Sequence, residues 1–188
     1  MAALNSRQFP GVYADLGVDL SKLGCIMLDL DPISVTSLVS DGEDDLFFSN
    51  DPQYPYAQGA VAEQVAHLTL LYGLMESGPN WQSQVDAVLE GWAPEPVVID
   101  SIGYFPPSDP REDYWVIVGH VQPTDNLIEG HQRLQLLPHI DTFPEYRPHV
   151  TLAYIKGGIA RRGKWLHSLQ VAISASSLPV SGINYGGR

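Results

Sequence analysis

Two copies of one short pattern decide how this chain folds: H-L-T-L-L-Y from His67 to Tyr72 and H-V-T-L-A-Y from His149 to Tyr154. Side chains alternate across a β-strand, so the histidine and threonine of each copy share one face, while the apolar residues share the other. Each copy therefore predicts a strand with an apolar back for a core and a His/Thr pair in front. By the same alternation, the closing tyrosine is expected on the apolar side.

The pattern of apolar residues predicts further elements on both sides of the two motifs. Strands are expected at 25–30, 97–105, 114–121, 169–173 and 180–183, and helices at 32–39, 81–90, 125–137 and 161–167. The order strand-helix-strand-helix-strand then occurs twice, which predicts an α+β fold of two similar lobes. We expect residues 1–24 to form an extended arm and residues 25–188 to form a single bilobal domain.

Composition and charge restrict the class of ligand. The net charge of -12 argues against binding along a nucleic-acid polymer, because affinity for a polyanion comes mainly from Lys and Arg. No apolar run approaches the roughly 20 residues that cross a bilayer, and the first residues lack a signal-peptide core. Cys25 is the only cysteine, so an internal disulfide is excluded. We expect a cytoplasmic protein without a membrane partner; the charge does not indicate an oligomeric state.

The basic residues are concentrated around the second motif. Five of the ten lie between positions 147 and 164, with no acidic residue among them: Arg147, Lys156, Arg161, Arg162 and Lys164. This stretch is either a solvated basic loop or a site for a small anionic ligand. Arg147 and Lys156 are candidate phosphate contacts, and three aromatic residues are candidate platforms for stacking a base: Tyr13, Trp115 and Tyr185.

A facing pair of histidines is suited to acid-base chemistry. Histidine titrates near neutral pH, so one imidazole of a pair can act as base while the other acts as acid. The threonine two residues after each histidine points the same way and can donate its hydroxyl to a phosphate oxygen. Threonine is a poor metal ligand, so the H-x-T pattern favours catalysis without a metal or other cofactor. The candidate catalytic residues are His67, Thr69, His149 and Thr151.

The two motifs resemble the paired H-x-T signatures of the two-histidine (2H) phosphoesterase superfamily, and the likeness in element order covers about residues 25–184. The resemblance implies two pseudosymmetric lobes, each an antiparallel sheet with flanking helices, around a central cleft that holds both motifs. It also implies a phosphoric diester hydrolase in which His67 and His149 are the acid and the base, in an order left open. Thr69 and Thr151 would hold the phosphate.

Within that superfamily, G-V-Y-A-D-L-G-V-D-L-S-K-L-G-C-I-M-L-D from position 11 and R-P-H-V-T-L-A-Y-I-K from position 147 are most similar to phage anti-CBASS proteins. This likeness implies a phosphodiesterase that cleaves 3'-5' bonds of cyclic oligonucleotide second messengers, with a small cyclic oligonucleotide as its partner. Two alternatives stay open: a 2',3'-cyclic phosphodiesterase acting on RNA ends, and a sponge that binds nucleotides without cleaving them.

Overall fold

The computed structural model describes residues 23–47, 66–107, 113–141 and 145–186. Seven antiparallel strands form one sheet in the order β6-β3-β4-β5-β2-β1-β7. The fold is mixed α+β, as the sequence predicts. The strands are β1 (Gly24–Leu30), β2 (His67–Leu74), β3 (Val97–Phe105), β4 (Tyr114–Val121), β5 (His149–Lys156), β6 (Ser177–Leu178) and β7 (Val180–Gly186). The proposed arm, 1–24, lies outside the described residues apart from its last two positions.

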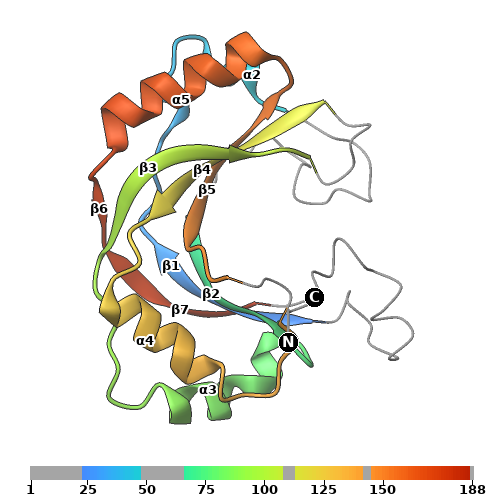
Figure 1. Cartoon of the computed structure of the whole chain (residues 1–188), viewed down its shortest axis with the longest axis vertical. Helices are drawn as coiled ribbons and strands as arrows, with labels where there is room; N and C mark the ends of the chain where they lie inside the picture. Colours follow the sequence, from blue (N-terminus) through green and yellow to red (C-terminus); the bar gives the residue numbers. More distant parts are fainter. Residues whose placement is uncertain (1–22, 48–65, 108–112, 142–144, 187–188) are drawn as a thin grey trace.

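The sheet consists of two halves that meet at the two motif strands. β5 pairs with β4 over its whole length, and β2 pairs with β1 in the same way, whereas β2 and β5 share a single pair in register. Figure 1 shows the resulting bend, with β3, β4 and β5 on one side and β1, β2 and β7 on the other. Each half therefore has one H-x-T strand at the junction.

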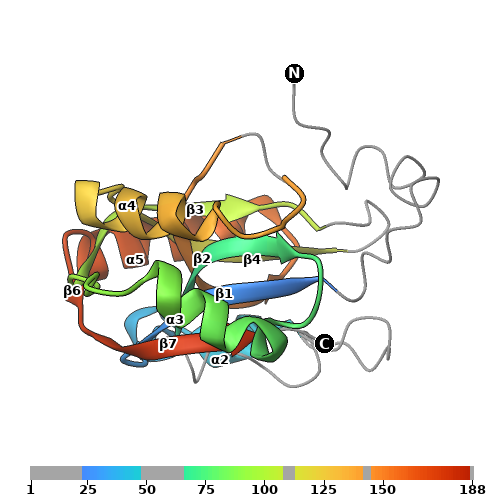
Figure 2. The same ribbon diagram turned by 90° about the horizontal axis from the view of Figure 1, so that it is seen from below.

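Helices cover the sheet in a way that follows this division. The helical elements are η2 (Thr36–Leu38), α2 (Gly42–Asp45), η4 (Gly78–Trp81), α3 (Gln82–Val88), α4 (Asp125–Leu134) and α5 (Ile159–Ile173). α5 packs on β3 and β4, while α4 packs on β2 and contacts α3 (Figures 1 and 2). Within the described ranges, no helix has the length and apolar character needed to cross a membrane.

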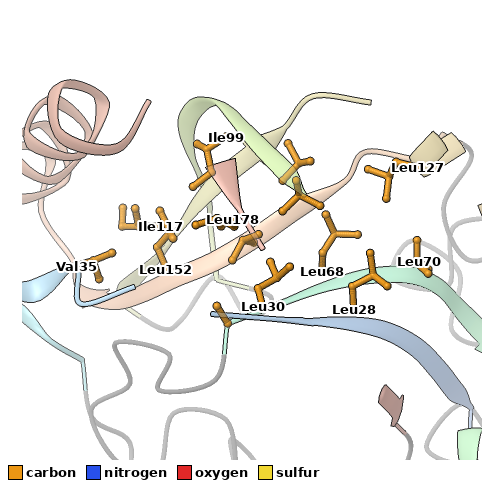
Figure 3. Packing of buried hydrophobic residues seen from close by; sticks show 14 of the residues in the cluster. Leu28, Leu30, Val35, Leu68, Leu70, Ile99, Ile117, Leu127, Leu152 and Leu178 are labelled. Carbon is orange, nitrogen blue, oxygen red and sulfur yellow. The ribbon is translucent and has the colours of Figure 1, made fainter. Parts of the chain in front are cut away.

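One apolar core lies between the helices and the sheet. Leu68 and Val150, each next to a motif histidine, are fully buried in it. Figure 3 shows Leu68 beside Leu28 of β1, which is also fully buried. The helices contribute side chains such as Leu134 and Trp165. We call this side of the sheet the core face, and the opposite side, which carries the histidine and threonine of each motif, the histidine face.

Several expected elements are confirmed and two are wrong. The hairpin of β3 and β4 has the predicted bounds, and α4 begins after Thr124, whose hydroxyl accepts from the Leu127 amide at 3.2 Å. The helix expected at 32–39 is only the single turn η2, because β-branched residues crowd that stretch. The strand expected at 169–173 is the end of α5, where buried apolar residues recur every four positions rather than every two.

A buried carboxylate ties α2 to α5. Asp45 accepts hydrogen bonds from the Trp165 indole at 2.9 Å and from Arg161 at 2.8 Å, and Lys164 lies 2.6 Å away. Burial alone would raise the pKa of Asp45, but the bonds from Lys164, Trp165 and Arg161 outweigh it and lower the pKa. The ionised form therefore stabilises the fold.

We predict that Asp45→Asn lowers the free energy of unfolding at pH 7 by about 1–3 kcal/mol, because charge-assisted bonds to buried donors are lost. Since the folded pKa lies below the unfolded value, this contribution is complete above about pH 4 and is lost as the pH falls through the folded pKa. Urea unfolding across this range measures it. Asp44→Asn, an exposed neighbour, is the matched control; equal stability of both variants at pH 7 would contradict the assignment.

Candidate active site

The antiparallel register of β2 and β5 brings the two motifs together. Leu68 pairs with Val150 in an antiparallel ladder. The residues next to this pair are therefore also opposed: His67 lies across from Thr151, and Thr69 lies across from His149. Directly opposed side chains on one face have Cβ atoms roughly 5 Å apart. All four side chains are partly exposed. The sequence-predicted set of two histidines and two threonines thus lies together where the two halves of the sheet meet.

The flanking strands add polar neighbours that the sequence did not single out. Asp29 of β1 is in register with His67, and His120 of β4 is in register with His149. The His120 ring lies over Gly103, where a Cβ would collide with it. His120, which the sequence pattern left as an ordinary structural histidine, therefore belongs to the histidine face beside the second motif.

The ring of His149 is held in a defined orientation. Its Nδ1 lies 2.9 Å from the Arg147 carbonyl, and a carbonyl only accepts, so Nδ1 donates its hydrogen there. Nε2 is consequently the nitrogen that gains or loses a proton. The edge-to-face contact with Phe105, at 5.0 Å between ring centroids, limits the tilt of the imidazole further. This arrangement suits an imidazole that exchanges protons at Nε2, either as acid or as base.

A stacked pair of rings supports β2 beside Thr69. Tyr146 and His131 stack at 3.9 Å with an angle of 5° between their planes. The Tyr146 hydroxyl donates to the Thr69 carbonyl at 3.2 Å, and His131 Nδ1 donates to the Leu70 carbonyl at 2.6 Å. Burial lowers the pKa of His131, more than the bond to Leu70 raises it, and burial raises the pKa of Tyr146. Both rings therefore stay neutral at neutral pH and fix the backbone at Thr69.

Each motif strand contains a β-bulge at the same position. Leu70 is the extra residue of β2 against β1, and Leu152 is the extra residue of β5 against β4. The bulge reverses the alternation, so Tyr72 shares a face with Thr69, and Tyr154 shares a face with Thr151. The expectation that both tyrosines lie on the apolar side is therefore wrong. All three repeated polar residues of each motif are on the histidine face.

The aromatic candidates lie away from this cluster. Trp115 is on the core face near α5, where the Arg162 guanidinium stacks on it at 4.4 Å. Tyr185 is also on the core face, and its hydroxyl donates to Asp86 of α3. Burial and the bond to Asp86 raise the pKa of Tyr185 to about 12. Tyr13 lies outside the described residues.

The basic stretch is engaged in contacts within the fold. Arg147 pairs with Glu145 at 2.6 Å and is largely exposed, while Lys156 donates to the Asp44 carbonyl at 2.5 Å. The other three basic side chains of the stretch pack on aromatic rings or pair with a carboxylate: Arg161, Arg162 and Lys164. These contacts tie elements of the fold together, and Arg147 also orients His149 through its backbone carbonyl.

The neighbours in register with the four motif residues include neither Lys nor Arg. They are Met27, Asp29, Val118 and His120. Within the described parts of the chain, no group of three His, Cys, Asp or Glu side chains is arranged to hold a metal ion. The cluster can supply two proton-transferring imidazoles and two hydroxyl donors to one anionic centre.

Comparison with known proteins identifies the class to which this site belongs. A family model described as the 2'-5' RNA ligase superfamily matches residues 52–172, more than half of the chain and a span that includes both motifs. The chain belongs to this superfamily, one of the two-histidine phosphoesterases. Membership supports a phosphodiesterase activity in general terms.

Two further comparisons add less. Among solved structures, Usb1 from Kluyveromyces marxianus is similar, with a TM-score of 0.47, 11% identity, and coverage of 84% of this chain and 85% of that chain. No curated protein matches the sequence.

We predict that Tyr146→Phe lowers the free energy of unfolding by about 1 kcal/mol, because the Thr69 carbonyl loses its donor. The same change should lower kcat more than it alters KM, since it loosens the strand that carries His67 and Thr69. Urea unfolding and steady-state kinetics measure the two effects. Tyr104→Phe, on the core face near α5, is the control. An unchanged kcat in Tyr146→Phe would show that this ring pair does not position the catalytic residues of β2.

Proposed function

We propose that the protein is a metal-independent phosphodiesterase that cleaves 3'-5' bonds of small cyclic oligonucleotides. The observation that carries the proposal is the antiparallel pairing of the two H-x-T strands at Leu68 and Val150, which places the two motifs side by side. In this proposal His67 and His149 exchange protons with the attacking and departing oxygens, and Thr69 and Thr151 donate to the phosphate.

The proposed chemistry uses the substrate's own nucleophile. One imidazole takes the proton of a ribose 2'-hydroxyl, which attacks the adjacent phosphorus, while the other imidazole protonates the departing 5'-oxygen. The threonine hydroxyls stabilise the charge that builds on the nonbridging oxygens. The products are a linear chain with a 2',3'-cyclic phosphate end and a 5'-hydroxyl end. Water then opens the cyclic phosphate in a second step, with the two imidazoles exchanging roles.

Charge favours a short substrate over a long one. A polymer of RNA would need several Lys and Arg along its path, whereas the positions in register with the motifs carry none, and the chain has a net charge of -12. A cyclic di- or trinucleotide presents few phosphates and needs little neutralisation. The likeness to phage anti-CBASS proteins supports such a messenger as substrate. The enzyme would then act in the cytoplasm of an infected bacterium, where removing the messenger evades CBASS immunity.

We predict that the protein linearises cyclic di- or trinucleotides in the presence of EDTA. Incubation with a panel of these molecules and with RNA bearing 2',3'-cyclic ends, followed by mass spectrometry, identifies the substrate and product. If the protein hydrolyses the RNA ends and leaves the cyclic oligonucleotides uncleaved, the substrate is an RNA end and the proposed substrate is wrong. Tight binding with unchanged ligand would indicate a sponge, and complete loss of turnover in EDTA would contradict metal independence.

We also predict that His67→Ala and His149→Ala each lower kcat by at least about a hundredfold, because each removes one proton-transfer step. His167→Ala, an exposed histidine on α5, is the matched control and should retain full activity. In the unsubstituted protein, kcat should show a bell-shaped dependence on pH, since one imidazole must be neutral and the other protonated. A sigmoidal profile unaltered by either substitution would refute the assigned roles.

A further inference from the structure

Asp29 and Asn184 form a hydrogen-bonded pair on the histidine face, beside the first motif. Asn184 of β7 donates its amide to Asp29 Oδ1 at 3.0 Å. The bond runs diagonally between the strands, because the residue in register with Asn184 is Met27. On its other side, Asp29 is in register with His67. Both side chains of the pair are partly exposed. The pair therefore offers polar atoms to a ligand that is bound at the motifs.

The sheet beside this pair is open. Gly182 of β7 is in register with Asp29, and a Cβ at this position would meet no described atom within 4 Å. At Gly186, by contrast, a Cβ would lie 2.6 Å from the terminal methyl carbon of Met27. The Met27 side chain thus extends toward Gly186, which leaves the space above Gly182 clear. A flat group can reach the carboxylate of Asp29 over this glycine.

The two strands hold the carboxylate in place and leave part of its hydrogen-bonding capacity. The Ser181 hydroxyl donates to the Asp29 carbonyl at 3.2 Å, which adds to the ladder between β1 and β7. A carboxylate has sites for about four donors, so the bond from Asn184 leaves capacity on both oxygens. The Asn184 amide has a second N–H and an oxygen of its own. The pair presents mainly acceptors, with one further donor beside them.

The chemistry of the pair decides which part of a nucleotide lies next to it. A carboxylate repels phosphate oxygens, and it accepts hydrogen bonds without donating any. The phosphate therefore belongs at the motif histidines and threonines, and the group next to Asp29 has to carry N–H donors. Neighbouring strands are about 4.8 Å apart, so β7 lies roughly 10 Å from β2. A nucleotide spans a comparable distance from its phosphate to the outer edge of its base.

We propose that Asp29 and Asn184 form a guanine-binding subsite, which makes the protein selective for cyclic oligonucleotides that contain guanine. The inference rests on the proposed function for the class of ligand and adds the identity of the base. Guanine is the one common base with two adjacent donors on its Watson–Crick edge, N1–H and the 2-amino group, and these match the two oxygens of a carboxylate. The second N–H of Asn184 supplies a donor for guanine O6.

The other bases match the pair less well. Adenine has an acceptor, N1, where guanine has a donor, and a carboxylate repels it. Uracil has one donor between two carbonyl oxygens, and cytosine places an acceptor next to its amino group. Hypoxanthine keeps N1–H and O6 but lacks the 2-amino group, so it isolates the second hydrogen bond to Asp29. A site built to hydrogen-bond a ligand discriminates against analogues that lack the bonding group, because its own polar group then loses a partner.

Binding of uncleavable ligands tests the subsite separately from catalysis. Cyclic dinucleotides built from 2'-deoxyribose lack the hydroxyl that attacks phosphorus, so calorimetry measures their Kd without turnover. We predict that deoxy cyclic di-GMP binds about ten- to hundredfold more tightly than deoxy cyclic di-IMP, and that deoxy cyclic di-AMP binds most weakly. Asp29→Asn should bring the three Kd values within about threefold of one another, because the acceptor that distinguishes the bases is lost.

Matched variants separate recognition of the base from a structural role. Asp31→Asn, an exposed carboxylate beyond the end of β1, should keep the selectivity of the unsubstituted protein. Gly182→Val fills the open space and leaves both polar side chains in place, so it should weaken binding of deoxy cyclic di-GMP by about tenfold or more. Gly163→Val, at an equally open glycine of α5, should leave this Kd unchanged. Thermal unfolding of each variant checks that the fold is retained.

The outcomes distinguish this inference from the proposed function. A preference for guanine that is lost in Asp29→Asn supports the subsite. Equal Kd values for the three ligands in the unsubstituted protein, a preference that persists in Asp29→Asn, or binding of none of them would overturn it. Turnover is measured separately on the corresponding ribonucleotides. If these bind with the guanine preference and are not cleaved, the proposed function is wrong and the guanine subsite stands.

Discussion

The antiparallel pairing of Leu68 with Val150 is the constraint on which the site depends. It is the one in-register pair between the two halves of the sheet, and both side chains are fully buried in the common core. Because the next residues on either side are the histidines and threonines, the register of this pair decides whether the motifs meet. A slip of one residue would turn one motif into the core. The bonds from Tyr146 and His131 to β2 reinforce the junction where the strand ladder is shortest.

The two halves of the sheet share the arrangement of their motif strands and differ in the residues beside the histidines. Both motif strands carry the same bulge, so His, Thr and Tyr of each copy share one face, and both have a polar residue of the neighbouring strand beside the histidine. Proton transfer between two oxygens requires unlike protonation states in two like residues. The two halves differ beside the histidines, where β1 places Asp29 in register with His67 and β4 places His120 in register with His149.

Local patterns in the sequence were sufficient for the parts of the fold that depend on local interactions. Alternation predicted β3 and β4, the apolar pattern predicted a helix that begins at Asp125, and the paired motifs predicted the four-residue cluster. Alternation could not predict the bulges, since an extra residue is defined only against a partner strand. Asp29 and His120 were missed because strand order, which sets their neighbours, is a tertiary property. The pairing of Arg161 and Lys164 with Asp45 could not be predicted either, because that carboxylate is more than a hundred residues away along the chain.

The central claim is that His67 and His149 act as one unit on one phosphodiester. The most direct test measures kcat on the cyclic oligonucleotide substrate for His67→Ala, His149→Ala and the double variant. Residues that serve the same step are strongly non-additive, so we predict that the double variant loses about as much activity as either single variant. Losses that multiply, or a single variant that keeps most of its activity, would contradict the account.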